Sequence, residues 1–98
     1  MIEVHTTVPD VDSAEEIAFE LVDAGYAACV NYHEIRSVYR WEGETVVESE
    51  YAVDVKTSRD FEEVRQAVED IHPYDVPAVI RRKSEANDDY EDWVDRNS

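Results

Sequence analysis

The sequence has very little cysteine and glycine. Its 98 residues include one cysteine, Cys29, and two glycines, Gly25 and Gly43. One cysteine excludes an internal disulfide and any metal site built on a pair of cysteines. Two glycines cannot build a glycine-rich phosphate loop, and no serine or cysteine nucleophile motif is present, so an enzyme is not expected. With no lysine or arginine near it in the sequence, Cys29 is expected to be a small buried side chain rather than a reactive thiol.

Positive charge and long apolar runs are also scarce. Nine lysine and arginine residues stand against 25 aspartate and glutamate residues, which gives a net charge of −16. Such a surface repels phosphate groups and anionic lipids, so neither a nucleic-acid partner nor a membrane partner is expected. No segment approaches the roughly 18 apolar residues of a membrane-spanning helix, and a cytoplasmic location is expected.

The acidic residues are spread along the whole chain rather than gathered at one site. They have two interpretations, because an acidic coat either collects cations or keeps a protein hydrated in concentrated salt. Salt at about 1 M shortens the Debye length to about 3 Å, which mutes the repulsion between the carboxylates. The even spread favours the salt-adapted surface and predicts a halophilic source.

The hydrophobic periodicity predicts seven elements within a single domain that covers residues 1–98. Ser13 with Glu16, and Asp60 with Glu63, have the spacing of capping boxes at the starts of two helices. The predicted elements, in chain order, are strand 2–8, a helix from 13 with a glycine stop at 25, strand 27–41 loosened at 32–34, strand 47–56, helix 60–71, strand 76–83 and a short helix from 87.

This order of elements predicts an α+β fold. Right-handed crossovers place the two main helices on one face of an antiparallel four-stranded sheet, with the short helix at the C-terminal end. The architecture is a ferredoxin-like sandwich. The two long strands on either side of Glu42 and Gly43 form a ribbon longer than a domain of this size covers. Its unpaired edges predict strand pairing with another subunit.

Three histidines are the only side chains that offer a nitrogen ligand. His5 lies among polar residues of the first strand and is a weak metal candidate, since a hydrogen-bonded role is commoner there. His33 is expected in a surface loop. His72 closes a helix, where the dipole favours an imidazolium. Its functional alternative is a ligand for Cu²⁺ or another divalent cation, because neutral imidazole suits such ions.

Aromatic residues form a second candidate site. Tyr39 and Trp41 from the ribbon and Tyr74 from the loop after the second main helix, together with Cys29, are candidates for lining a pocket between subunits. The competing interpretation is that these aromatics pack the core and the subunit interfaces, with their polar atoms reaching a partner.

Five segments have a characteristic order and spacing. They are residues 4–9 (VHTTVP), 27–31 (AACVN), 37–43 (SVYRWEG), 72–77 (HPYDVP) and 90–93 (YEDW). In this order and spacing they resemble the CutA family of divalent-cation tolerance proteins. The resemblance implies a homotrimer whose long ribbons pair between subunits, and a role in divalent metal ion, notably copper, binding or tolerance.

The resemblance also implies particular residues. His72 matches the histidine of the His-Pro-Tyr motif that has been linked to copper in this family. Ala78 stands where the family commonly has a glutamate, and Thr6 stands where some relatives have a cysteine. Both departures remove a ligand, although Glu50, Asp75 or a neighbouring subunit's carboxylate could substitute. One histidine with loosely placed carboxylates forms a weak, poorly selective site.

Two other functions compete with metal tolerance. The trimeric ferredoxin-like architecture also resembles that of the PII signalling proteins, which implies a small-molecule-sensing or adaptor trimer by analogy of fold. A purely structural trimer is the third alternative.

Overall fold

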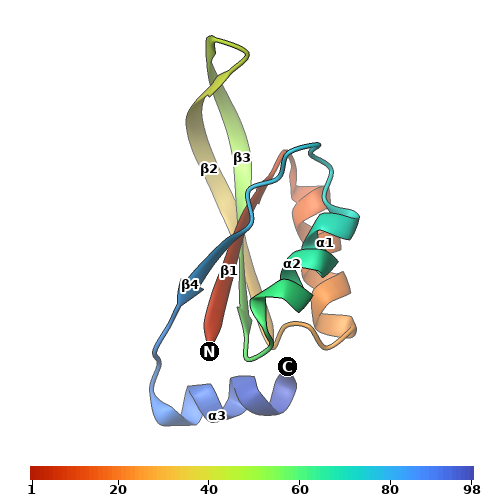
Figure 1. Cartoon of the computed structure of the whole chain (residues 1–98), viewed down its shortest axis with the longest axis vertical. Helices are drawn as coiled ribbons and strands as arrows, with labels where there is room; N and C mark the ends of the chain where they lie inside the picture. Colours follow the sequence, from red (N-terminus) through yellow and green to blue (C-terminus); the bar gives the residue numbers. More distant parts are fainter.

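The computed structural model describes residues 1–98 as a four-stranded antiparallel sheet with three helices, which confirms the predicted α+β class (Figure 1). The strand order is β2-β3-β1-β4, so the first strand lies inside the sheet. The elements are β1 (Ile2–Val8), α1 (Val11–Asp23), β2 (Cys29–Trp41), β3 (Glu44–Thr57), α2 (Phe61–Ile71), β4 (Ile80–Lys83) and α3 (Asp88–Asn97).

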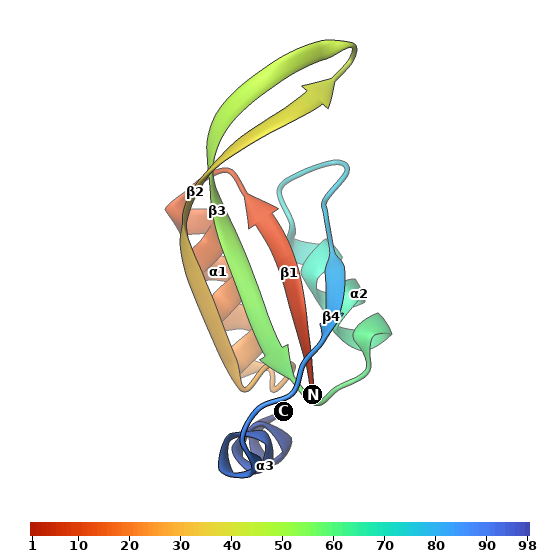
Figure 2. The same cartoon turned by 90° about the vertical axis from the view of Figure 1, so that its left-hand side faces the viewer.

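Helices α1 and α2 cover one face of the sheet and leave the opposite face open (Figure 2). The core lies between these two layers, because alternate residues of the central strands point toward the helices. Burial of such side chains is the main stabilising contribution in a domain of this size. The ten core residues are Val4, Val8, Ala14, Ile17, Leu21, Ala27, Val53, Val55, Val64 and Val68.

The β2–β3 ribbon extends well beyond the helices, and the molecule measures 45 × 23 × 22 Å (Figure 1). Pairing is continuous from Cys29 opposite Lys56 to Trp41 opposite Glu44. The predicted loosening at 32–34 is therefore wrong, because β3 supplies partners to every residue of that stretch. Glu42 and Gly43 have φ angles of 50° and 81° at the turn, the left-handed geometry that suits a two-residue hairpin.

The start of α1 differs from the prediction. Asp10 is the N-cap, and its carboxylate accepts a hydrogen bond of 2.8 Å from the amide of Ser13. Ser13 therefore lies inside the first turn, because an equally good capping residue stands three positions before it. The predicted glycine stop is confirmed: Gly25 has a φ of 78° directly after the C-cap, Ala24.

The start of α2 is only partly as predicted. Asp60 is the N-cap, but its side chain makes no capping hydrogen bond. Glu63 does not reach back to it, because Glu63 pairs with Arg59 at 3.3 Å.

The last strand is shorter than predicted. β4 begins at Ile80 rather than at Val76, because Pro73 and Pro77 interrupt the preceding segment and a proline has no amide hydrogen for a strand ladder. Residues 72–79 form a loop instead. Helix α3 follows the N-cap Asn87, at the position predicted from the sequence.

Candidate functional site

A cleft lies between the distal part of the ribbon and the loop at residues 73–78. Its volume is about 680 Å³. The ribbon supplies one wall, the loop supplies the other, and the end of β1 contributes Thr7. The lining residues are Thr7, Ser37, Tyr39, Trp41, Val46, Glu48, Glu50, Pro73, Tyr74, Asp75, Val76 and Ala78.

The cleft combines aromatic rings with negative charge. Tyr39, Trp41 and Tyr74 are lining residues, and Glu48, Glu50 and Asp75 stand among them, whereas the lining contains no lysine, arginine or histidine. Aromatic faces and carboxylates both attract cations and repel anions. The arrangement therefore suits a positively charged or neutral ligand better than a phosphate.

A buried carboxylate stabilises one side of the cleft. Glu50 is only 6% exposed, and its Oε2 accepts a hydrogen bond of 2.7 Å from the Tyr74 hydroxyl. Burial raises the pKa of Tyr74 well above its ordinary range, and the hydrogen bond and charge of Glu50 add to the effect. Tyr74 therefore remains a protonated donor. The hydrogen bond to Glu48 is the main cause that raises the pKa of Tyr39.

His72 anchors the loop to β1. Its Nδ1 accepts a hydrogen bond of 3.1 Å from the amide of Tyr74, and its Nε2 lies 2.8 Å from the Oγ1 of Thr6, a fully buried residue. Because Nδ1 accepts a hydrogen bond, the ring proton is on Nε2, which donates a hydrogen bond to the Oγ1 of Thr6. His72 is the C-cap of α2, as predicted, and burial lowers its pKa, which opposes the imidazolium that the helix dipole favours. Both ring nitrogens are already engaged.

His5 has a different environment, on the open face of the sheet. Its Nδ1 lies 2.9 Å from the Oδ1 of Asp54, and its side chain is 17% exposed. The Nη1 of Arg82 lies 3.6 Å from the same oxygen. Nε2 makes no hydrogen bond within the chain. A carboxylate on one ring nitrogen with the other nitrogen free is the arrangement commonly found around histidine ligands of metals.

Cys29 and His33 lie outside the cleft. Cys29 is the first residue of β2, at the end of the strand remote from the ribbon tip, so it does not line a pocket with Tyr39. Cys29 is half-buried, and Lys56 is its cross-strand neighbour, so the expectations of full burial and of no nearby cation are both wrong. His33 is exposed, but in a strand rather than in a loop.

The chain by itself does not assemble a conventional metal site. No three histidine, cysteine, aspartate or glutamate side chains converge on one point. Thr6 is occupied by its hydrogen bond to His72, and Ala78 lines the cleft without offering a ligand.

Two functional contacts were not apparent from the sequence. The sequence offered Glu50 only as a substitute metal ligand, whereas the loop covers it and makes it the partner of Tyr74. Nothing in the sequence assigned a role to Asp54, and pairing of β1 with β3 places it directly opposite His5. The alternation pattern could have suggested the second contact once the strand register was known, but not the first.

No helix of the chain has both the length and the apolar character needed to span a membrane.

Comparison with known proteins agrees with these observations. The family model described as CutA1 divalent ion tolerance protein matches residues 2–97. The chain belongs to the CutA1 family. One relative is the divalent-cation tolerance protein CutA of Pyrococcus horikoshii, which is 41% identical over 96 residues, covering 96% of this chain and 94% of that protein.

Solved structures of CutA1 relatives share the fold. The periplasmic divalent cation tolerance protein CutA from Archaeoglobus fulgidus has a TM-score of 0.93 at 36% identity, covering 99% of this chain and 98% of that one. The PII-like protein CutA from Nostoc sp. PCC 7120 has a TM-score of 0.92 at 30% identity, covering 99% and 96%. Because one relative is described as periplasmic, the cytoplasmic location of this chain stays a prediction. The halophilic source also stays a prediction.

Proposed function

We propose that this chain acts in divalent-cation tolerance as a non-enzymatic homotrimer that binds Cu²⁺ or another divalent cation. Family membership supports the tolerance role. The observation that carries the binding site is the unengaged Nε2 of His5, held in place by the carboxylate of Asp54 at 2.9 Å.

The exposed edges of the sheet support assembly. β4 is an edge strand whose four residues are all exposed, and three of them are Arg81, Arg82 and Lys83. The ribbon tip is acidic, with Glu42 and Glu44 at its turn. Pairing the basic edge of one copy with the acidic ribbon of another covers two unpaired edges and joins opposite charges. Such a head-to-tail contact closes into a ring, and three copies are the ring that the CutA resemblance implies.

In this geometry His5 is better placed than His72 to bind a metal through its imidazole ring. His72 would have to release the amide of Tyr74 from Nδ1 before it bound a metal, whereas His5 has a free lone pair on Nε2. The charged side chains close to His5 are Asp54, which contacts its Nδ1, and Arg82, which pairs with Asp54. A single imidazole does not make a selective site. The remaining ligands are proposed to come from other copies that pack against the open face.

A Cu²⁺ titration followed by electron paramagnetic resonance tests this proposal. We expect nitrogen hyperfine features that saturate for the native chain, disappear in His5→Ala and persist in the matched control His33→Ala. Loss of the signal in His72→Ala alone would assign the ligand to His72 instead. An oxygen-only spectrum that never saturates would mean that the acidic surface merely collects cations.

A second candidate function is small-molecule sensing at the aromatic cleft. The specific observation that favours it is a lining with three aromatic rings and three carboxylates but no cationic side chain. The ligand chemistry that fits is a small organic cation. A thermal-shift screen should give a rise in melting temperature with spermidine or choline and none with AMP. The rise should be lost in Trp41→Ala and kept in His5→Ala. A screen without any such shift would remove this candidate.

A further inference from the structure

Helix α1 has an exposed aromatic ring on its outer face. Phe19 is 66% exposed, and Val22, which follows it by three residues, is 43% exposed. Residues three and four positions away are the neighbours of a side chain on a helix surface. Apart from Val22, the neighbours of Phe19 are all acidic, namely Glu15, Glu16 and Asp23. Three of the four helix neighbours of this large apolar side chain therefore carry carboxylates.

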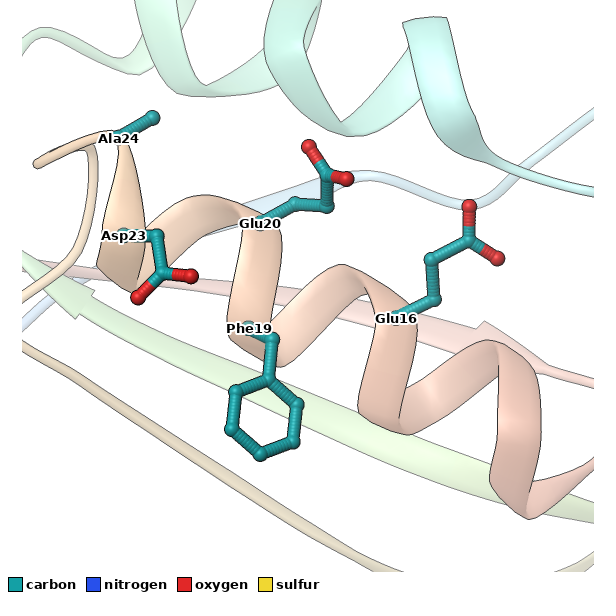
Figure 3. Close-up of a pocket in the computed structure, with 5 residues that line it drawn as sticks. All are labelled: Glu16, Phe19, Glu20, Asp23 and Ala24. Atoms are coloured by element: carbon teal, nitrogen blue, oxygen red, sulfur yellow. The ribbon is translucent and has the colours of Figure 1, made fainter.

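The close-up in Figure 3 shows how these side chains lie. The ring of Phe19 stands on the side of α1 remote from α2, whereas Glu16 and Glu20 extend on the side of α2. Together with Asp23 and Ala24 they surround a shallow open pocket of about 390 Å³. We call the outer surface formed by Phe19, Val22 and these carboxylates the Phe19 face.

The carboxylates of α1 and α2 differ in their ion pairing, although the two helices lie in one layer. On α2, Arg65 pairs with Glu62 and Glu69 at 2.9 and 2.8 Å. Glu63 pairs with Arg59, and Asp70 accepts a hydrogen bond from Gln66. The five carboxylates of α1 form no ion pair with any cation of the chain; they are Asp12, Glu15, Glu16, Glu20 and Asp23. The negative charge of α1 is therefore not neutralised by any cation of its own chain.

We propose that the Phe19 face is a docking surface for a basic amphipathic helical segment of another protein. An apolar side chain of that segment would cover Phe19 and Val22, and flanking lysine or arginine residues would pair with Glu16 and Asp23. A second copy that met this face with its own α1 would bring carboxylates against carboxylates, and the basic β4 edge of a second copy is already assigned to the ribbon. This surface lies on α1, whereas the proposed trimer uses the ribbon tip, the β4 edge and the open sheet face.

The competing account is a salt-adapted surface on which a lone exposed Phe19 has no role. The two accounts differ in whether binding of a basic segment depends on the aromatic ring. General attraction to a net charge of −16 would not depend on it.

The probe for this test is a fluorescein-labelled peptide of about 14 residues, composed of lysine and leucine with the leucines on one helical face. Fluorescence anisotropy of the peptide is measured against the full chain at about 0.1 M and about 1 M salt. A scrambled peptide of the same composition, with no apolar face, is the matched control. We expect the patterned peptide to bind at least about tenfold more tightly than the scrambled one.

Two pairs of variants locate the binding surface. Phe19→Ser should weaken binding about tenfold, whereas Trp93→Ser, a change at an aromatic side chain of α3 that is 38% exposed, should leave it within about twofold. The double variant Glu16→Gln with Asp23→Asn should weaken binding and reduce its salt dependence. Asp89→Asn with Asp92→Asn removes the same charge from exposed sites on α3 and should have less effect.

All of these substitutions are at exposed or partly exposed positions, so each variant is expected to fold, which thermal unfolding checks. Equal binding of the two peptides, or unchanged binding in Phe19→Ser, would overturn the proposal and leave only general attraction between opposite charges.

Discussion

The two halves of the β2–β3 ribbon share one continuous strand pairing but lie in different environments. At the base, Val53 and Val55 of β3 are fully buried beneath α1 and α2. Toward the tip, the cross-strand pair Val38 and Val47 is 69% and 55% exposed. Backbone hydrogen bonds continue through both halves, so the ladder alone does not distinguish them. The base is stabilised by burial of apolar side chains, and the tip is not covered by anything in its own chain.

This difference separates folding from function. The base positions the sheet, while the exposed half carries Tyr39 and Trp41 of the cleft and the edge that we assign to contacts between copies. Substitutions at the base should therefore lower stability, and substitutions at the tip should change assembly or binding while the chain still folds.

The largest effect is expected from a charge at the tip. Val47→Lys places a positive charge in the ribbon where we propose that the basic edge of another copy packs, so the homotrimer should dissociate into folded monomers. Sedimentation velocity measures the mass, and circular dichroism reports the fold. Val47→Ile, which retains an apolar side chain, should remain a trimer. A trimer that persists in Val47→Lys would show that the tip is not an interface.

At the base, Val53→Ala should lower the free energy of unfolding by about 2–3 kcal/mol, through lost burial and the cavity that remains. Urea denaturation of the variant and the native chain gives the difference. The oligomeric state of the folded protein should not change. A loss below about 0.5 kcal/mol would place Val53 among surface residues and contradict the core described above.

At the junction of the two halves, Tyr74→Phe removes the donor to Glu50. The buried carboxylate then loses a hydrogen-bond partner, and we expect a cost of about 1–2 kcal/mol in urea denaturation. Tyr39→Phe is the matched control, and it should cost less because Tyr39 and Glu48 are both exposed. Equal losses in the two variants would mean that the burial of Glu50 has no special role.

The smallest effect is a pH dependence from His72. Burial lowers its pKa below the ordinary value of 6.5, so the unfolded chain takes up this proton at a higher pH than the folded chain. The stability that neutral His72 contributes is therefore complete above pH 6.5 and declines as the pH falls from 6.5 toward the lowered folded value. Melting temperatures between about pH 8 and pH 5 should fall more for the native chain than for His72→Gln. Parallel curves for the two proteins would contradict this role.

The sequence predicted the element order, the sheet and the helix layer, because these follow from local periodicity and the rules of chain crossover. It misplaced the first cap, because Asp10 and Ser13 are equally suitable residues and only the geometry of the entering chain distinguishes them. It extended β4 through Pro77, although a proline there argues against a continuous strand.

The candidate site was harder to predict, since it depends on contacts between distant residues. The sequence selected Tyr39, Trp41 and Tyr74, which the fold does bring into one cleft. It did not predict that His5 has a free ring nitrogen and His72 has none. These states depend on Asp54 and Thr6, which lie 49 and 66 positions away in the chain from His5 and His72. Nor could it exclude Cys29 from the cleft without the direction and length of β2.

The most direct test of the central claim, a cation site completed between copies, is Cu²⁺ binding by the native trimer and by Val47→Lys. Both proteins are titrated under the same conditions, and the bound metal per chain is measured after equilibrium dialysis. The account predicts a saturable, His5-dependent site in the trimer that is absent from the folded monomeric variant. A folded monomer that binds Cu²⁺ with the same stoichiometry and the same dependence on His5 would contradict it.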